Sequence, residues 1–378
     1  MPNHDKLSAP PGFSSHSFTG SAENRRVLVA MSGGVDSSVA AYLLKERGYR
    51  PEGVTFKLWC HGNDDNYRQI IDRAAAVCSG LEIKHHVIDI EGEFKETVVR
   101  HFVEKYLSGL TPNPCVFCNR VIKWRYLLLA ADRSGIPFVA TGHYARIEQN
   151  ADTGRYELMA AADKRKDQSY MLWQLSQDML KRTLFPLGNQ IKSDVKEIAR
   201  QMGLHDENLK ESQDVCFLPN NDYREFLNAY APERVAQIAR GELVDENNKV
   251  LGYHDGFHNF TIGQRKGFKM GFAGRKYVKE IDAVQNRVVI ADNDRLFSRG
   301  MVIGNVNWVS SEPRKSVEGF IRIRYNHKGV KCRIESLDDK NYQVRFETGQ
   351  RAVTPGQSAV LYRDNRLILG GTITKPIE

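Results

Sequence analysis

The stretch Met31-Ser32-Gly33-Gly34-Val35-Asp36-Ser37-Ser38 decides the fold class, because it lies where an apolar run gives way to a helical pattern. Arg26–Met31 (R-V-L-V-A-M) is typical of a buried parallel strand, and Ser37–Arg47 has helical periodicity that ends at Gly48. Glycines allow backbone N–H groups to turn toward an anion, and the N-terminus of the next helix adds a positive dipole end. We therefore predict a phosphate-binding loop, with hydroxyl donors from Ser32, Ser37 and Ser38. The alternative is a tight turn without a ligand.

Asp36 stands inside this loop, where its carboxylate is suited to hold Mg²⁺ beside a phosphate rather than to contact the phosphate itself. No Lys follows the glycines, so the G-x-x-x-x-G-K-[ST] pattern that holds a γ-phosphate is absent. The loop is therefore predicted to hold the whole pyrophosphate of a nucleotide, with chemistry at the α-phosphate.

The chain around this loop alternates strand and helix patterns, which is the βαβ rhythm of an open, mostly parallel α/β sheet. Further helices are expected at Asn119–Arg133, Ser169–Arg182 and Ser193–Met202, and others at Tyr67–Cys78 and Phe94–Tyr106. The remaining strands are expected at Gly53–Leu58, Glu82–Ile90 and Phe138–Thr141. Past about Phe217 short alternating strands dominate, such as Arg287–Ile290, Gly319–Arg324 and Gln343–Glu347, and predict a small β-barrel or sandwich.

The composition indicates a soluble protein with a polyanionic partner or a generally basic surface. The 378 residues are 41% hydrophobic and 26% charged, with a net charge of +8. No apolar run is long enough to span a membrane. The six cysteines are too sparse for a disulfide scaffold, so we expect a cytoplasmic location and interpret the close pair Cys115 and Cys118 as chemistry or metal binding.

Six motifs follow one another from the glycine loop to the C-terminus. After S-G-G-x-D-S, which resembles the loop of the PP-loop ATP pyrophosphatases, come T-P-N-P-C-V-F-C-N-R at 111–120, A-T-G-H-Y-A-R at 140–146, K-D-Q-S-Y at 166–170, E-S-Q-D-V-C-F at 211–217, G-Q-R-K-G at 263–267 and T-P-G-Q at 354–357. In this order the chain resembles the tRNA-specific 2-thiouridylases from Arg25 onward.

The resemblance implies a domain plan and a nucleotide site. It implies an ATP-binding PP-loop domain at 25–218 (adenine nucleotide alpha hydrolase-like), a central tRNA-contacting domain at 219–283 and a C-terminal β-barrel domain at 284–378, after a disordered leader at 1–24. ATP and Mg²⁺ are the implied cofactors. The ATP site would consist of Ala30, Met31, Ser32, Gly33, Gly34, Val35, Asp36, Ser37, Phe56 and Gly142, with Asp36 on the metal.

The implied chemistry is sulfur transfer. Uracil O2 is a poor leaving group until AMP is attached to it, and a thiolate or persulfide can then attack C2. The resemblance makes Cys216 the carrier of the persulfide and Cys118 the nucleophile that releases the sulfur, leaving a transient disulfide. We expect the dipole of a helix beginning near Cys118, together with Arg120 and Lys123, to favour its thiolate. The alternative for Cys216 is a buried small hydrophobe.

Cys115 departs from many members of that family, which have an acidic residue at this position that is thought to assist proton transfer at the target uridine. A thiol performs this role less directly. Cys115, Cys118 and Cys216 together suggest a second possibility, an iron–sulfur cluster with one open iron. A structural metal half-site on Cys115 and Cys118 is a third.

The resemblance also implies contacts to tRNA, whose target base must leave its stack to reach the site. Asn113 and Pro114, next to Cys115, would contact that base. Other implied contacts are His143, Lys166, Asp167, Gln168, Arg324, Tyr325 and Gln357. Without the resemblance, His143 would be a packing or solvent residue, the run 166–168 a solvated helix start with Asp167 as its cap, and the last three residues surface strand residues.

The sequence thus predicts ATP-dependent 2-thiolation of the wobble uridine of tRNA, with a persulfide relay protein or cysteine desulfurase as sulfur donor. Two rival functions are a PP-loop enzyme that adenylates an acceptor for attack by an amine and a non-catalytic tRNA-binding sulfur carrier. The donor, the tRNA species and the oligomeric state are not determined by the sequence.

Overall fold

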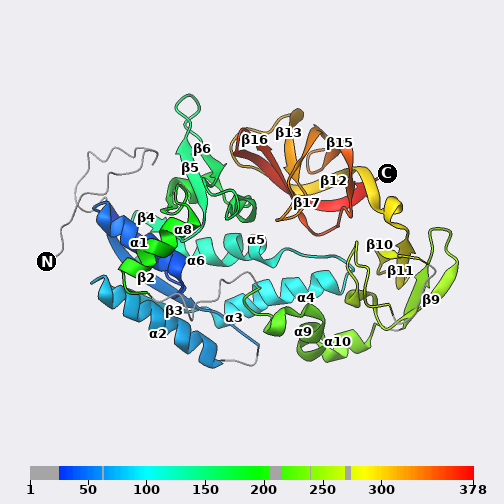
Figure 1. Ribbon diagram of the computed structural model, residues 1–378, viewed down its shortest axis with the longest axis horizontal. Helices are drawn as coiled ribbons and strands as arrows, with labels where there is room; N and C mark the ends of the chain where they lie inside the picture. Colours follow the sequence, from blue (N-terminus) through cyan, green and yellow to red (C-terminus); the bar gives the residue numbers. More distant parts are fainter. Residues whose placement is uncertain (1–24, 62–63, 205–214, 239, 269–273) are drawn as a thin grey trace.

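The computed structural model of the protein describes residues 25–61, 64–204, 215–238, 240–268 and 274–378 (Figure 1). The predicted leader at 1–24 and the first four residues of the motif at 211–217 lie outside these ranges. No helix within them is long and apolar enough to cross a membrane.

The N-terminal part is a parallel sheet with the strand order β3-β2-β1-β4-β7, which confirms the predicted α/β class. Its central strand β1 is buried on both faces, as the run of apolar residues predicts: Val27 and Leu28, which point to opposite faces, are 0% and 2% exposed. The strands are β1 (Arg26–Ala30), β2 (Arg50–Lys57), β3 (His85–Asp89), β4 (Phe138–Ala140) and β7 (Thr183–Leu184). The helices α1 (Val35–Glu46) and α2 (Asp64–Gly80) pack on them, and α8 (Lys192–Gln201) packs on α1.

Two long helical segments follow β3, and each contains a π-helical turn. One is formed by α3 (Glu91–Phe94), η2 (Lys95–Val99) and α4 (Arg100–Tyr106), and the other by α5 (Pro114–Cys118), η3 (Asn119–Trp124) and α6 (Arg125–Arg133). The second begins five residues earlier than predicted, because Asn113 caps it by accepting the Val116 N–H (3.4 Å) and Pro114 suits the first helical position. Cys118 therefore lies one turn inside the helix rather than at its start.

The helix predicted over Ser169–Arg182 is wrong as a single element. The structure has a 3₁₀ turn η4 (Ser169–Leu172) and a separate helix α7 (Gln177–Lys181). Ser176 starts α7 by accepting the Met179 N–H at 3.3 Å, and Trp173 between the two elements is 1% exposed. The break in the helix therefore accompanies the burial of the Trp173 indole between the two elements.

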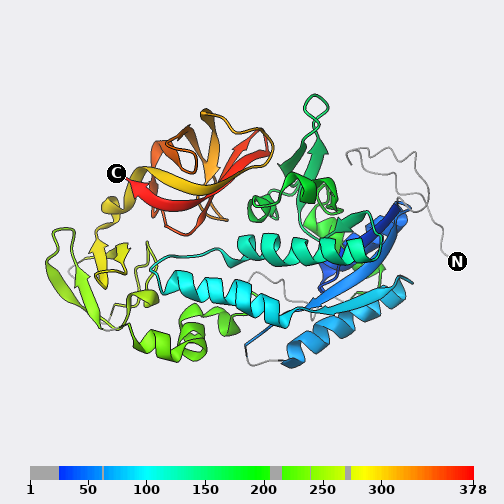
Figure 2. The ribbon, with the colours of Figure 1, turned by 180° about the vertical axis from the view of Figure 1, so that it is seen from behind.

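A small middle domain follows, seen at the opposite end of the molecule from β1–β3 in Figures 1 and 2. Its sheet has the order β10-β11-β8-β9. The elements of this region are η6 (Pro219–Asn221), α9 (Tyr223–Tyr230), α10 (Pro232–Ala236), β8 (Gly241–Val244), β9 (Val250–His254), η7 (Phe257–Asn259), β10 (Tyr277–Asp282) and β11 (Arg287–Ala291).

The C-terminal part closes into a barrel, which decides between the barrel and the sandwich that the sequence left open. Strand β12 (Phe297–Trp308), which follows η8 (Asn293–Leu296), pairs with both β15 (Tyr342–Arg351) and β17 (Arg366–Ile377). The circuit is completed by β13 (Ser316–Arg322), β14 (Val330–Ser336) and β16 (Ser358–Arg363).

A hairpin from the N-terminal part joins this barrel, a feature that the sequence did not predict. It consists of β5 (Ala145–Gln149) and β6 (Tyr156–Ala160), and β6 pairs with β17 at Arg366 and Met159. The barrel is thereby attached to the same part of the chain that carries the glycine loop.

Candidate active site

The glycine loop forms the predicted strand-to-helix turn. Gly33 has φ +68°, and a Cβ there would lie 2.8 Å from the Ile70 carbonyl oxygen, so glycine is required on two grounds. The Ser37 hydroxyl accepts the Ser32 N–H at 3.1 Å and donates to the Gly34 carbonyl at 3.0 Å. The loop is thus held by its own serines in front of the N-terminus of α1, as an anion site requires.

Gly142 lies directly against this loop. A Cβ at Gly142 would be 2.8 Å from both the Asp36 carbonyl carbon and the Ser37 nitrogen, so the chain after β4 approaches the start of α1 backbone to backbone. Phe56, near the end of β2, is half-buried. It packs beside Ala30 and against the cluster that contains Leu28 and Val54. The structure therefore brings these predicted nucleotide-site residues to the carboxyl edge of the sheet, where ligands bind in such folds.

Asp36 has partners that the sequence did not reveal. Its Oδ1 accepts the Tyr144 hydroxyl at 2.8 Å and the Lys192 ammonium at 2.7 Å. Lys192 begins α8, 156 residues from Asp36, and its side chain is 11% exposed. The glycine motif lacks a lysine, yet the fold supplies one to the loop from another element. The carboxylate remains suited to a cation, and the ammonium to a phosphate.

The cysteines that the sequence singled out lie close to one another. The thiol of Cys216 interacts electrostatically with those of Cys118, Cys115 and Cys60. Cys118 is buried at 5% exposure, Cys115 and Cys60 are half-buried and Cys216 is exposed. The fold packs the neighbours of Cys216, Val215 and Phe217, into the buried cluster that contains Cys118, although Cys118 and Cys216 are almost a hundred positions apart in sequence.

The structure does not support the prediction that the Cys118 thiol is readily ionised. Burial raises the pKa of this thiol to about 11, while the charge of Lys123 and the Lys123 backbone N–H lower it only in part. The surrounding protein also raises the pKa of Cys216 to about 12, although this residue keeps accessible surface. The prediction failed because the dipole acts mainly in the first helical turn, whereas Cys118 lies at its end and is desolvated.

The charge of Lys123 acts on the pKa of the thiols and on that of His143. Its charge lowers the pKa of Cys118, Cys115 and Cys216 and adds to the effect of burial on His143, whose pKa falls to about 3. The neutral imidazole is held by a 2.7 Å hydrogen bond between its Nδ1 and the Thr141 hydroxyl. His143 is therefore a neutral hydrogen-bonding group at this site rather than a cation.

The cluster expected on Cys115, Cys118 and Cys216 gains no support. Across the described residues, no group of three His, Cys, Asp or Glu side chains is arranged to hold a metal ion. We take neither the cluster nor the metal half-site further.

Two distant motifs meet at the turn that precedes Cys115. The Gln357 amide donates to the carbonyls of Thr111 (3.0 Å) and Pro112 (3.2 Å), and the Thr111 N–H donates to the Pro355 carbonyl at 3.1 Å. Gly356 permits this contact, because a Cβ there would lie 2.8 Å from the Thr111 oxygen. Gln357 thus fixes the turn that places Asn113 and Pro114.

Tyr170 lies near several of the residues predicted to contact RNA. Its hydroxyl donates to the Ser358 carbonyl at 2.7 Å. Burial raises its pKa, while the Ser358 hydrogen bond, the charge of Arg324 and the Asn113 side chain lower it in part, and its ring centroid is 6.1 Å from that of Tyr325. Arg324 is exposed and Tyr325 is half-buried. The barrel loop after β13 therefore reaches the same place as the turn before Cys115.

Asp167, the central residue of the K-D-Q motif, has mainly a structural role. Asp167 is buried, with its side chain 1% exposed, and it accepts Arg322 from β13 at 2.9 Å and the N–H groups of Ala161 and Ser169 at 3.1 Å. A direct RNA contact does not fit this burial. Gln168 accepts the Tyr144 N–H at 2.9 Å, and Lys166 is half-buried.

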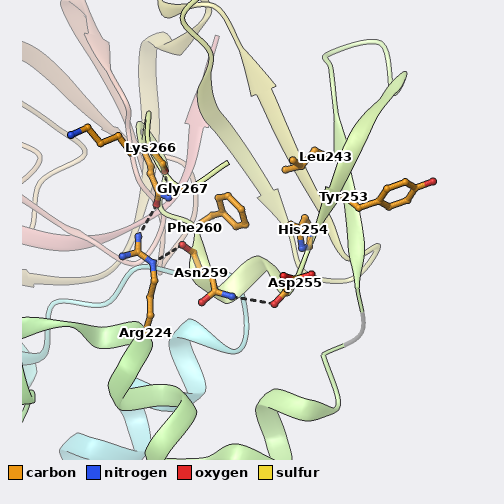
Figure 3. Close-up of a pocket in the computed structure, with 10 residues that line it drawn as sticks. Arg224, Leu243, Tyr253, His254, Asp255, Asn259, Phe260, Lys266 and Gly267 are labelled. Carbon is orange, nitrogen blue, oxygen red and sulfur yellow. Dashed lines mark hydrogen bonds between the residues drawn. The ribbon is translucent and has the colours of Figure 1, made fainter. Parts of the chain in front are cut away.

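The middle domain holds a cavity of about 390 Å³ between α9 and its sheet (Figure 3). Arg224 crosses one side, donating to the Asn259 carbonyl at 2.8 Å and the Gln264 side chain at 3.1 Å. Gln264, Lys266 and Gly267 of the G-Q-R-K-G motif at 263–267 line it. This loop is therefore attached to a basic hollow rather than to the thiol site.

Comparison with known proteins gives the family. Residues 25–220 match the family described as tRNA methyl transferase HUP domain, 224–292 the tRNA methyl transferase PRC-barrel domain and 298–373 the aminomethyltransferase beta-barrel domain. A tRNA-specific 2-thiouridylase MnmA of Geotalea uraniireducens is 43% identical over 371 residues, covering 94% of this chain and 96% of the relative. The enzyme of the same name from Lachnoclostridium phytofermentans is 41% identical, covering 93% and 100%.

Solved structures are more distant. A 4-thiouridine synthetase in complex with RNA and ATP is 19% identical and covers 56% of this chain and 51% of its own, with a TM-score of 0.35. The identity and coverage of the curated relatives show the family without this likeness: the chain belongs to the tRNA-specific 2-thiouridylases.

Proposed function

We propose that this protein uses ATP to replace O2 of the wobble uridine of tRNA with sulfur. The observation that carries the proposal is the meeting of Cys118, Cys216 and Lys123. The name of the curated relatives supports tRNA thiolation in general, and the geometry of this chain supports the steps below.

The glycine loop would bind the ATP phosphates through the residues from Ala30 to Ser37, with Phe56 and Gly142 beside the nucleotide. Asp36 would hold Mg²⁺, which offsets phosphate charge, and Lys192 would then move from the carboxylate to a phosphate oxygen. Both groups are already within 2.7 Å of each other at the loop. The uracil O2 would attack the α-phosphate, which forms the O–P bond of an adenylate and releases pyrophosphate.

The RNA would be held by the barrel and the turn at 111–114. Exposed Arg324 would contact phosphate, Tyr325 would stack, and Asn113 with Pro114 would border the extruded base. Lys166, Gln168 and His143 would complete the contact surface, while Asp167 and Gln357 would position it through their contacts to Arg322 and the turn at 111–112.

Sulfur transfer would then take place in two balanced steps. The terminal sulfur of a Cys216 persulfide attacks C2 and expels AMP, giving C2–S–S–Cys216. The Cys118 thiolate attacks the Cys216 Sγ, so the uridine leaves with its new sulfur and a Cys118–Cys216 disulfide remains. The half-buried Cys115 thiol borders these atoms in place of an acid. The persulfide donor would be a relay protein or a cysteine desulfurase, reaching the exposed Cys216.

The test is single-turnover reaction of persulfidated enzyme with unmodified tRNA, followed by mass spectrometry of its nucleosides. We expect 2-thiouridine at the wobble position and its loss in Cys118→Ser and Cys216→Ser. If both variants still consume ATP and modify an acceptor with an amine, the amidating rival is correct. If wild-type enzyme releases no pyrophosphate with tRNA, the sulfur-carrier rival is correct.

A further inference from the structure

Cys60 is a fourth thiol at this site that the steps above do not use. It follows β2, and its Sγ lies 3.9 Å from the Cys216 carbonyl oxygen. The thiols of Cys60 and Cys216 also interact electrostatically. The buried Tyr67 side chain belongs to the same buried cluster as Cys118, and Cys60 packs against this cluster.

The two segments that carry Cys60 and Cys216 are fixed to the same aromatic residue. Trp59 packs edge-on against Phe226 of α9 with ring centroids 6.3 Å apart, and Phe217 packs on the same ring at 5.5 Å. Phe217 is 1% exposed and Phe226 is 0% exposed. Because Trp59 precedes Cys60 and Phe217 follows Cys216, the packing holds the two thiol-bearing residues next to each other.

Exposure creates a difficulty that Cys60 can solve. Cys118 is 5% exposed, so a Cys118–Cys216 disulfide offers a bulky reductant only its Cys216 sulfur, whereas a Cys60–Cys216 disulfide would offer the sulfurs of a half-buried and an exposed residue. Thiol–disulfide exchange needs the attacking sulfur to reach the attacked one. An attacking thiol therefore reaches the sulfur of Cys216 more easily than the buried sulfur of Cys118.

We propose that Cys60 is the resolving cysteine of the catalytic cycle, moving the disulfide from the buried Cys118 to the surface. This rests on the proposed function, which supplies the Cys118–Cys216 disulfide. The Cys60 thiolate attacks the Cys216 Sγ, a Cys60–Cys216 bond forms, and Cys118 leaves as a thiolate that takes up the proton Cys60 lost. The exchange is redox-neutral. A protein dithiol of the thioredoxin class then supplies two electrons and restores both thiols.

The first experiment tests the geometry without the reaction. The full-length Cys115→Ser/Cys118→Ser variant is oxidised with low diamide, alkylated and mapped by peptide mass spectrometry. We expect a Cys60–Cys216 disulfide as the main product, with Cys332 in the barrel remaining alkylated as the internal control. A Cys60 that stays alkylated while Cys216 is oxidised would overturn the proposal, whatever the enzyme does.

The second experiment tests the cycle, with a thioredoxin-class protein as reductant and a renewed persulfide supply. Cys60→Ser should give a burst of about one 2-thiouridine per enzyme and then turn over at least about tenfold more slowly than wild type. A small phosphine reductant should restore turnover, because it reaches the buried disulfide. Cys332→Ala should behave as wild type.

The trapped species separates the outcomes. Stalled Cys60→Ser should contain Cys118–Cys216, and stalled wild type should contain Cys60–Cys216. A Cys115–Cys118 disulfide in wild type, or full turnover of Cys60→Ser with the protein reductant, contradicts the role of Cys60. Absence of any product in the first turnover of wild type contradicts the proposed function instead.

Discussion

At the scale of single residues, Lys123 is the cation whose charge acts on three of the thiols. It lowers the pKa of Cys118 against a burial that raises that pKa to about 11, and it acts on Cys115 and Cys216 as well. A protonated thiol is a poor nucleophile. The resting site is therefore protected, and the charge of Lys123 becomes important when a thiolate is needed.

Lys123→Met should slow single-turnover sulfur transfer by about tenfold, equivalent to a rise of one unit in the thiol pKa. From pH 7 to 10 both rates should rise about tenfold per pH unit and the defect should stay near tenfold, because the thiol pKa of both proteins lies above this range. Lys123→Arg, which keeps the charge, is the control. Quenched-flow measurement of 2-thiouridine from pH 7 to 10 checks this, and rates that do not rise with pH, or a variant as fast as wild type, would show that Lys123 does not act on the thiol pKa.

At the scale of elements, the site depends on where backbones touch. The end of β4 meets the N-terminus of α1 at Gly142, and the turn before α5 meets the loop before β16 at Gly356, each at a distance that excludes a side chain. The break between η4 and α7 has a related cause, the burial of Trp173. Such approaches transmit small changes of one element to the next.

Gly142→Ala should weaken ATP binding by about tenfold or more, because the added methyl would be 2.8 Å from backbone atoms of Asp36 and Ser37 and overpacking forces a shift. Isothermal titration with a non-hydrolysable ATP analogue measures this. The control is Gly92→Ala in α3, where a Cβ meets nothing within 4 Å. Equal affinities of both variants would separate Gly142 from the nucleotide site.

The Asp167–Arg322 pair links the loop after β6 to the barrel. Asp167→Ala should lower the free energy of unfolding by about 3 kcal/mol, because it leaves the guanidinium without its buried partner. Asp132→Ala, which breaks a 2.6 Å pair with Arg182 at 56% exposure of the carboxylate, should cost at most about 1 kcal/mol. Urea unfolding checks both. Unchanged stability with lost tRNA binding would restore Asp167 as a direct contact.

At the scale of the whole molecule, the domain of the parallel sheet and the barrel meet beside the turn before Cys115. The β5–β6 hairpin joins the barrel sheet, and Arg324 and Tyr325 of the barrel come to Tyr170 beside the turn before Cys115. A substrate that spans both parts can therefore present one base to the thiols while its backbone lies on the barrel.

Arg324→Ala should weaken tRNA binding and reduce the slope of log affinity against log salt by about 1, as expected for one lost phosphate contact. ATP affinity should not change. Lys340→Ala, in an exposed turn of the barrel, is the charge-matched control. Fluorescence anisotropy with labelled tRNA at several salt concentrations measures both quantities, and an unaltered slope would remove Arg324 from the RNA surface.

The sequence by itself determined the parallel α/β sheet, the glycine loop and the identity of the thiols, because these depend on local periodicity and on short motifs. Only the tertiary structure decided that Lys192 reaches Asp36, that Asp167 is buried on Arg322, that Cys118 is a protonated thiol and that Cys60 lies beside Cys216. Each of these depends on burial and on contacts between residues far apart in the chain. Local periodicity carries no record of either.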